Sequence, residues 1–116
     1  MKITILKSKI HTATVTGAKL HYEGSIEIDE TLMKEASIRE YEKVLVANFT
    51  NGNRYETYVI KGKAGSGTIA VNGGGARYSA VGDTLTIFAF AQIDEAKKLK
   101  PKIIILGKNN RIVKRK

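Results

Sequence analysis

The fold is decided by the stretch HYEGSIEID, which occupies residues 21–29 of the 116-residue chain. Residues 25–28 alternate between polar and apolar side chains, a pattern that predicts a strand with one buried face. Asp29 follows directly and is a favourable helix N-cap, because its carboxylate can accept the free N–H groups of a first helical turn. The stretch therefore predicts a strand that begins at Ser25 and a short helix over residues 30–36, whose apolar side chains share one face.

Short strands separated by turns account for the rest of the chain. β-Branched or alternating apolar residues predict the strands, and glycine, asparagine and proline mark the turns between them. The expected strands cover residues 2–16, 44–47, 54–60, 68–71, 84–90 and 103–106. Many short strands with little helix predict an all-β fold, and a small closed barrel is favoured because closure removes exposed strand edges.

Several connections carry expectations of their own. Gly17-Ala18 is expected to break the first strand, residues 20–22 are expected to be a short extended stretch, and Asn51-Gly52 predicts a hairpin with a type I′ turn. Residues 94–99 are expected to form one helical turn that Pro101 stops. The tail beyond Lys108 is expected to be mobile, as chain ends often are.

The composition bounds the class of protein. The chain has the length of one domain, and its hydrophobic fraction of 42% is ordinary for a globular protein. No apolar run approaches the ~20 residues that cross a bilayer, and Lys7 and Lys9 interrupt the N-terminal apolar residues, so we expect a cytoplasmic protein without a membrane span. The absence of cysteine excludes disulfides and thiolate metal sites, and two histidines, His11 and His21, are too few for a zinc site, so no metal is expected.

The net charge of +9 raises the alternative of a small basic β-barrel that binds nucleic acid. Much of the excess lies between Lys97 and the C-terminus, and a basic tail is more often a solvated end than a recognition surface. No expected strand has the row of exposed aromatic residues that stacks bases. We therefore expect no nucleic-acid partner, although a basic surface would still attract a small anionic substrate.

The pair Gly24-Ser25 could carry chemistry of its own. Covalent geometry allows the Ser25 hydroxyl to attack the Gly24 carbonyl carbon, which would exchange the peptide bond for an ester. Elimination from that ester, followed by hydrolysis, would leave a pyruvoyl group at position 25 and cut the chain into residues 1–24 and 25–116. Because Gly-Ser pairs are common in turns, a plain turn before the strand is the alternative.

Other positions are ambiguous on their own. Gly62–Thr68 looks like a phosphate-binding loop but lacks its Gly-Lys-Ser/Thr ending, so an ordinary loop is favoured. Asn72–Gly75 could be a turn or a nest of N–H groups that binds an anion. Thr57 and Tyr58 are adjacent on an expected strand, so their side chains point to opposite faces, and both can serve one site only if a face meets a neighbouring subunit or the chain twists.

Several blocks in register resemble one known family. The blocks are Lys9-Ile10-His11, Leu20 to Ser25, Thr50 to Arg54, Thr57-Tyr58 and Val71-Asn72-Gly73. At this spacing, from the N-terminus to about Phe90, they are similar to the pyruvoyl-dependent aspartate 1-decarboxylases. The resemblance implies a six-stranded double-psi β-barrel with one or two short helices, assembled as a homotetramer whose active sites are shared between subunits.

The same resemblance implies an enzyme, a carboxy-lyase that converts L-aspartate into β-alanine and CO₂ for pantothenate (vitamin B5) synthesis. Autocatalytic cleavage between Gly24 and Ser25 would turn a zymogen into the active enzyme. The pyruvoyl group derived from Ser25 would form a Schiff base with the substrate amine. It would act as the electron sink that pyridoxal phosphate provides in other decarboxylases, so no external cofactor is expected.

The resemblance also assigns residue roles. Arg54 and Lys9 would bind the substrate carboxylates, since a guanidinium offers paired planar donors. Thr57 would polarise the Gly24 carbonyl during cleavage and later border the substrate, and Tyr58 would be the proton donor. The remaining expected substrate contacts are His11, Tyr22, Asn72, Gly73, Gly74 and Gly75. The family often has alanine at the last two of these positions.

Overall fold

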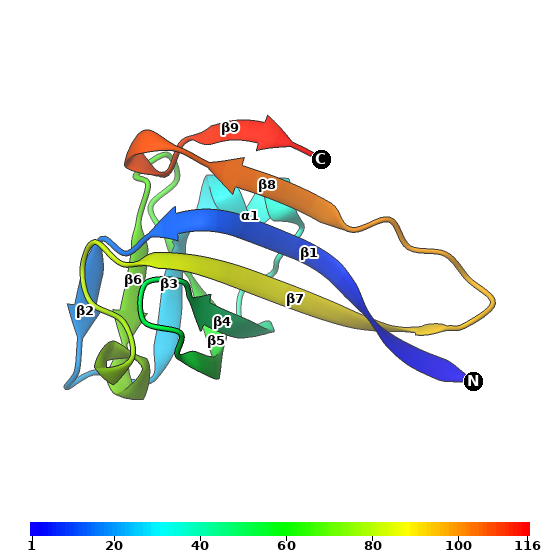
Figure 1. The fold of residues 1–116 in the computed structure, drawn as a ribbon, viewed down its shortest axis with the longest axis horizontal. Coiled ribbons are helices and arrows are strands. Elements are labelled where there is room, and N and C mark those ends of the chain that lie inside the picture. The colour runs from blue at the N-terminus through cyan, green and yellow to red at the C-terminus, as the bar shows by residue number, and fades with distance from the viewer.

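The computed structural model describes the whole chain, residues 1–116, as one mixed β-sheet with a single α-helix (Figure 1). The hydrogen-bonded strand order is β2-β6-β3-β5-β4-β7-β1-β8-β9. The strands are β1 Lys2–Thr14, β2 Gly17–Lys19, β3 Ser25–Asp29, β4 Lys43–Asn48, β5 Arg54–Gly62, β6 Ile69–Asn72, β7 Thr84–Asp94, β8 Lys102–Leu106 and β9 Ile112–Arg115. The α-helix α1 is Glu30–Ala36, and two short 3₁₀ helices are η1 Gly73–Arg77 and η2 Lys108–Asn110.

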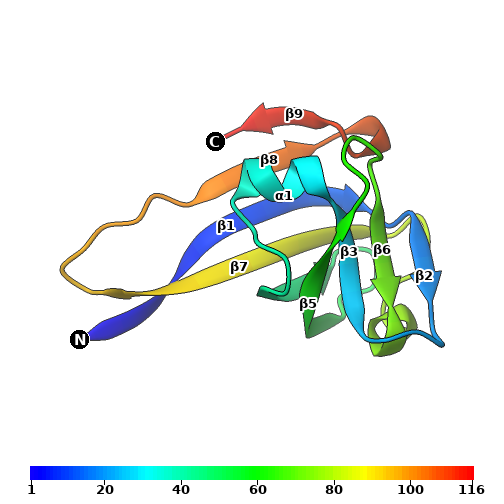
Figure 2. The same cartoon turned by 180° about the vertical axis from the view of Figure 1, so that it is seen from behind.

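The two longest strands lie next to each other. β1 pairs antiparallel with β7 and parallel with β8, and two register shifts interrupt the β1–β7 ladder. The first part of β1 and the last part of β7 extend as a two-stranded ribbon away from the other strands (Figures 1 and 2). The opposite end of the molecule carries β2, β3, β6 and η1, and this end contains the Gly24-Ser25 pair.

The connection from β2 to β3 crosses the end of another strand. β2 is parallel to β6 with Lys19 opposite Asn72, and β3 is antiparallel to β6 with Ser25 opposite the same Asn72. β6 therefore lies between two strands that are consecutive in the chain (Figure 2). Residues 20–24 have to pass over the end of β6, where Gly73 begins η1.

Alternate side chains of the strands bury one continuous core. Ile26 and Ile28 of β3 and Val44 and Val46 of β4 are at most 1% exposed, and each such side chain contributes about 1.5–3 kcal/mol by leaving water. Helix α1 contacts β3 and β5 from one half of the sheet and β1 and β8 from the other. The sheet is therefore curved enough for both halves to reach the same helix.

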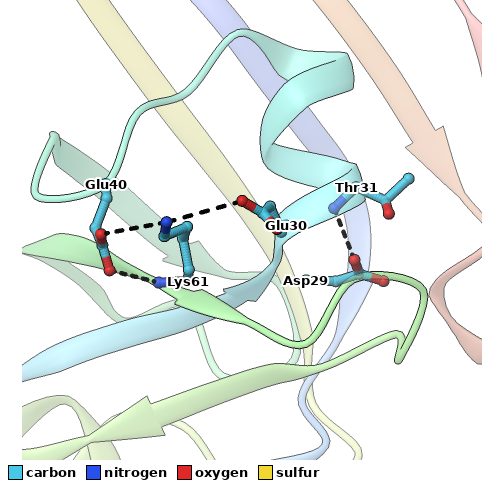
Figure 3. A network of polar contacts seen from close by, with 5 residues as sticks. All are labelled: Asp29, Glu30, Thr31, Glu40 and Lys61. Carbon is cyan, nitrogen blue, oxygen red and sulfur yellow. Dashed lines mark hydrogen bonds and ion pairs between the residues drawn. The ribbon is translucent and has the colours of Figure 1, made fainter.

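Asp29 ties this helix to the loop that precedes β6. Its carboxylate accepts N–H bonds from Thr31 (2.8 Å), Gly65 (2.9 Å) and Gly67 (2.8 Å), and Figure 3 shows the first of these at the start of α1. Burial raises the pKa of the Asp29 carboxyl, but the three backbone N–H donors lower it by more, so the pKa lies below its ordinary value. The carboxylate thus caps the helix and fixes the loop at once.

The elements around strand β3 are those that the sequence predicted. The helix over 30–36, its Asp29 cap and the strand that begins at Ser25 are confirmed, as is the all-β class. The other predicted strands are present, with their ends shifted or extended by up to four residues. The structure has nine strands where six were implied, and three of the nine, β2, β6 and β9, have only three or four residues.

One local prediction fails and another is only partly right, because distant strands supply a partner. The first strand is broken as predicted, since β1 ends at Thr14, but Gly17-Ala18 is not the break and instead begins β2, which pairs with β6. The tail beyond Lys108 is not a loose end, because η2 turns it back and β9 pairs antiparallel with β8. Hydrogen bonding to a strand that is remote in sequence leaves no mark on the local pattern.

Three turn predictions fail for local reasons. Asn51-Gly52 does not form a type I′ turn, since only Gly52 has a positive φ and the loop runs from Phe49 to Asn53. Residues 20–22 are bends rather than extended chain. Residues 94–99 contain no helical element: β7 continues to Asp94, and the one hydrogen-bonded turn there covers residues 94–97 and is closed by the Lys97 N–H and the Asp94 carbonyl oxygen.

The sheet has β2 at one end of its hydrogen-bonded order and β9 at the other. Closure into a double-psi barrel therefore stays a prediction. None of the helices has the length and apolar character that a membrane crossing requires.

We expect Asp29→Asn to lower the free energy of unfolding by about 1–2 kcal/mol at neutral pH, because a charged acceptor forms stronger hydrogen bonds than an amide. The folded-state pKa of Asp29 lies below the unfolded value. Its contribution is therefore present above the unfolded-state pKa of about 3.9 and is lost as pH falls through the folded-state value. Urea denaturation at neutral and acidic pH measures the difference, with Glu23→Gln as control, since Glu23 is exposed and its carboxylate forms no hydrogen bond or ion pair. A difference that does not shrink in acid would contradict this role.

Candidate active site

Ser25 is the best-defined polar group at the crossing. It is the first residue of β3, is only 2% exposed, and lies opposite Asn72 of β6. The Asn72 amide Nδ2 donates a hydrogen bond of 3.2 Å to the Ser25 Oγ. The hydroxyl itself points to the Glu23 carbonyl oxygen at 3.4 Å, which is long for an O–H···O bond. A buried serine with a fixed amide donor is unlike an ordinary turn serine, which faces water.

Gly73 fixes the backbone on the other side of the Gly24-Ser25 bond. Its φ is +71°, and an added Cβ would lie 2.7 Å from the Gly24 Cα and 2.8 Å from the Tyr22 carbonyl oxygen. Only glycine satisfies both the left-handed backbone and this close approach. The predicted glycine-rich loop is thus a 3₁₀ helix whose first residue packs against Gly24.

The three glycines of this loop differ in their surroundings. A Cβ at Gly74 would meet nothing within 4 Å, whereas a Cβ at Gly75 would lie 2.9 Å from the Tyr55 ring and from Val71. The alanine that the family often has at position 74 would fit this backbone, and the one at position 75 would require movement of a neighbour.

Tyr58 shares a face of the sheet with Ser25. The parallel strands β3 and β5 pair Ile26 with Val59, and the residues just before them are Ser25 and Tyr58. Tyr58 is 37% exposed and its ring lies 6.5 Å from that of Tyr41. Thr57 points to the opposite face, that of the buried Val59. Within a single chain the adjacent side chains of Thr57 and Tyr58 therefore lie on opposite faces of the sheet, as the sequence predicted.

The expected cations are distributed over the sheet. Arg54 begins β5, is exposed, and forms no ion pair within the chain. Lys9 lies on β1, with its ammonium 5.8 Å from the centre of the Phe88 ring. Strands β5, β4 and β7 separate β1 from β3 in the sheet. Within one chain, Lys9 and Ser25 therefore do not lie on adjacent strands.

The two remaining aromatic candidates are also apart. The His11 Nδ1 lies 3.3 Å from the Thr86 hydroxyl on β7. Tyr22 is in the crossing segment, is 56% exposed, and has the Lys19 ammonium 5.7 Å from its ring centre. The structure therefore brings together the backbone of Tyr22, Gly24, Ser25, Asn72 and Gly73, with Tyr58 on the adjoining strand.

A polar network behind the loop was not predicted from the sequence. The Tyr55 hydroxyl lies 3.0 Å from the Ser79 hydroxyl, and the Asn48 amide donates to the Tyr78 carbonyl (2.9 Å) and to Asp83 (2.8 Å). Burial raises the pKa of Tyr55, whereas the Ala80 N–H and the Asn48 amide lower that of Asp83. The alternation of Tyr55 with Thr57 and Val59 is the one sequence signal that would have placed Tyr55 inward.

Neither the main cleft of the chain nor any cluster of metal-binding side chains belongs to the site. A cleft of about 590 Å³ lies between Asp29, the 65–67 loop and Arg111, and no expected site residue lines it. No group of three histidine, cysteine, aspartate or glutamate side chains lies close enough together to hold a metal ion.

Comparison with known proteins identifies the family of the chain. A family model described as aspartate decarboxylase matches residues 1–113. The chain belongs to the aspartate decarboxylase family. An aspartate 1-decarboxylase of Caldicellulosiruptor saccharolyticus is 56% identical over 98% of this chain and 91% of its own length. Those of Ruminiclostridium cellulolyticum and Cytophaga hutchinsonii are 52% and 53% identical, over 99% and 97% of this chain and 91% and 100% of theirs.

Membership of the aspartate decarboxylase family confirms the resemblance that the sequence blocks indicated, and with it the prediction of a lyase. The match extends past Phe90, where the resemblance ended, almost to the C-terminus. Strand β8 and the start of β9 therefore lie within the region that the family shares, rather than in an added basic tail. The roles of the individual site residues stay predictions.

We expect Gly73→Ala to lower the free energy of unfolding by about 1–3 kcal/mol, because alanine is strained at a positive φ and its Cβ would overlap Gly24. Gly74→Ala is the matched control in the same loop and should stay within ~0.5 kcal/mol of the parent, since its Cβ meets open space. Thermal and urea unfolding of the three proteins measure both changes. Equal stability of the two variants would contradict the close packing described here.

Proposed function

We propose that this chain is an aspartate 1-decarboxylase that releases CO₂ from the α-carbon of L-aspartate and yields β-alanine, after cutting itself between Gly24 and Ser25. Family membership over residues 1–113 supports the reaction. The observation that carries the self-cleavage is the Ser25 hydroxyl, which is buried, follows an exposed glycine, and accepts a hydrogen bond from Asn72.

The cleavage balances with water as the only added reactant. The Ser25 Oγ bonds to the Gly24 carbonyl carbon while the C–N bond breaks, and the Ser25 nitrogen takes up the hydroxyl proton. Loss of the Ser25 α-proton then expels the Gly24 carboxylate and leaves a dehydroalanine. Water adds to the imine tautomer and ammonia departs, which leaves a pyruvoyl ketone at the start of the 25–116 fragment.

The residues around Ser25 fit this chemistry. Because the Asn72 amide donates to the Oγ, the hydroxyl proton is directed away from it, toward the Glu23 carbonyl oxygen. Gly73 packs against the Gly24 Cα and limits the movement of the backbone that has to be attacked. Holding a nucleophile beside its target in this way replaces a rare encounter with a fixed geometry.

Substrate binding would use the exposed face of β5. The pyruvoyl group supplies a ketone that reacts with the substrate amine and accepts the electrons of the departing carboxylate. Arg54 has no ion pair of its own, so its guanidinium is available for a substrate carboxylate. Tyr58, on the same face as Ser25, would hold the proton that returns to the α-carbon.

The location of Lys9 and His11 supports a shared site. Both lie on β1, three strands away from β3 in the sheet. A site that needs these side chains beside Ser25 would obtain them from β1 of a neighbouring copy. We therefore propose a homotetramer with active sites between subunits, acting in the cytoplasm to supply β-alanine for pantothenate synthesis.

We expect Ser25→Ala to abolish both self-cleavage and decarboxylation, because one side chain supplies the nucleophile and the ketone. Intact mass spectrometry and a CO₂-release assay with L-aspartate measure the two losses. Ser8→Ala is the control, since Ser8 is also fully buried but its hydroxyl has no hydrogen-bond partner. Two fragments in the Ser25→Ala protein would refute the proposed cleavage.

Tyr58→Phe should leave folding and cleavage intact but reduce turnover of L-aspartate by ~10²–10⁴-fold, the usual worth of a positioned general acid. Tyr41→Phe is the control, because the Tyr41 ring lies beside Tyr58 but is 72% exposed. If processed Tyr58→Phe enzyme keeps kcat within a few-fold of the parent, the proton comes from another group, such as water held by His11.

A further inference from the structure

The segment from Asn72 to Ser79 is held at both ends. At its start, Asn72 donates to the Ser25 Oγ and Gly73 packs against Gly24. At its far end, the buried Ser79 lies 3.0 Å from the Tyr55 hydroxyl. The proposed chemistry uses the first end only and gives no role to the second.

Tyr55 supports this segment in three ways. Its ring occupies the space that a Cβ on Gly75 would need, at 2.9 Å. The same ring stacks on Tyr78, with 5.7 Å between centroids and an angle of 28°. Its hydroxyl is hydrogen-bonded to that of Ser79. The Tyr55 side chain therefore contacts the segment at residues 75, 78 and 79.

The far side of the segment is equally fixed. Asn48, the last residue of β4, is 2% exposed and donates to the Tyr78 carbonyl oxygen at 2.9 Å and to the Asp83 carboxylate at 2.8 Å. Asp83 also accepts the Ala80 N–H at 2.9 Å. Tyr55 on one side and Asn48 on the other therefore hold the segment by hydrogen bonds. A movement of Ser79 would be transmitted through the short 3₁₀ helix η1 to Gly73.

We propose that Tyr55 is a positioning residue for the self-cleavage of the Gly24–Ser25 bond. It touches neither reacting atom. It acts through Ser79 and Gly75, which hold the 73–79 segment so that Gly73 presses on Gly24 and the Asn72 amide reaches the Ser25 Oγ. The inference rests on the self-cleavage proposed above and adds a residue outside the family blocks from which that function was inferred.

The test follows cleavage from time zero in protein made by cell-free translation, with intact mass spectrometry of samples taken over time. Tyr55→Phe keeps the ring and loses only the bond to Ser79, so its cleavage rate should fall about tenfold, the effect of one hydrogen bond on a barrier. Ser79→Ala, which also removes a long 3.4 Å contact with the Asn48 amide, should slow cleavage at least as much, and the double variant should be no slower than Ser79→Ala alone. Tyr78→Phe is the matched control, because the Tyr78 hydroxyl has no hydrogen-bond partner, and it should cleave at the parent rate.

Two further readouts separate positioning from a general loss of stability. The melting temperatures of Tyr55→Phe and Tyr78→Phe should agree, and the fraction of Tyr55→Phe that has been cut should show the parent kcat. A merely structural role would slow cleavage only together with a lowered melting temperature, and it would reduce the kcat of the cut fraction as well.

The outcomes are distinct. Parent cleavage with a slowed Tyr55→Phe and a non-additive double variant supports the inference. Parent cleavage with Tyr55→Phe at the parent rate, or with Tyr78→Phe slowed as much, overturns the inference and leaves the proposed function standing. A parent chain that stays uncut overturns the proposed function and the inference with it.

Discussion

The crossing of residues 20–24 over the end of β6 is the constraint on which the site depends. β2 and β3 flank β6 and meet it at the same residue, Asn72, so their connection has to pass within contact distance of Gly73. Only a residue without a Cβ and with a positive φ allows that approach. The crossing places the Ser25 hydroxyl beside the Asn72 amide and brings the Gly73 backbone into contact with Gly24. The surroundings of the Gly24-Ser25 peptide bond are thus a consequence of strand order.

Elements that are determined by neighbouring residues could be predicted from the sequence. Elements that are determined by pairing between remote strands could not. Alternation over 25–28 and the Asp29 cap specify the strand and α1, because neighbouring residues determine both. The short strands β2 and β9 exist only through hydrogen bonds to β6 and β8, which no window of sequence contains. For the same reason the sequence blocks identified Ser25 and Asn72 without showing that they touch. The Tyr55 network went unpredicted because its members are far apart in the chain.

The charge of the protein is separate from its site. Residues 1–95 contain eleven basic and eleven acidic side chains, and the nine basic side chains that remain all lie in 96–116. These residues form the 95–101 turn, β8, η2 and β9, at the side of the sheet opposite to β2, β6 and β3. The net charge of +9 therefore reflects one edge of the sheet. In the proposed function, recognition of a dianionic substrate would therefore depend on individual cations such as Arg54 rather than on the overall field.

The account makes Ser25 the source of the reactive group, so the covalent state of the purified protein tests it most directly. Intact mass spectrometry of freshly purified enzyme that decarboxylates L-aspartate should give two fragments, residues 1–24 and residues 25–116. The second fragment should be lighter than a serine-initiated chain by the elements of ammonia, and borohydride reduction should add hydrogen to its ketone. A preparation that turns over L-aspartate while its mass remains that of the single uncut chain would contradict the account.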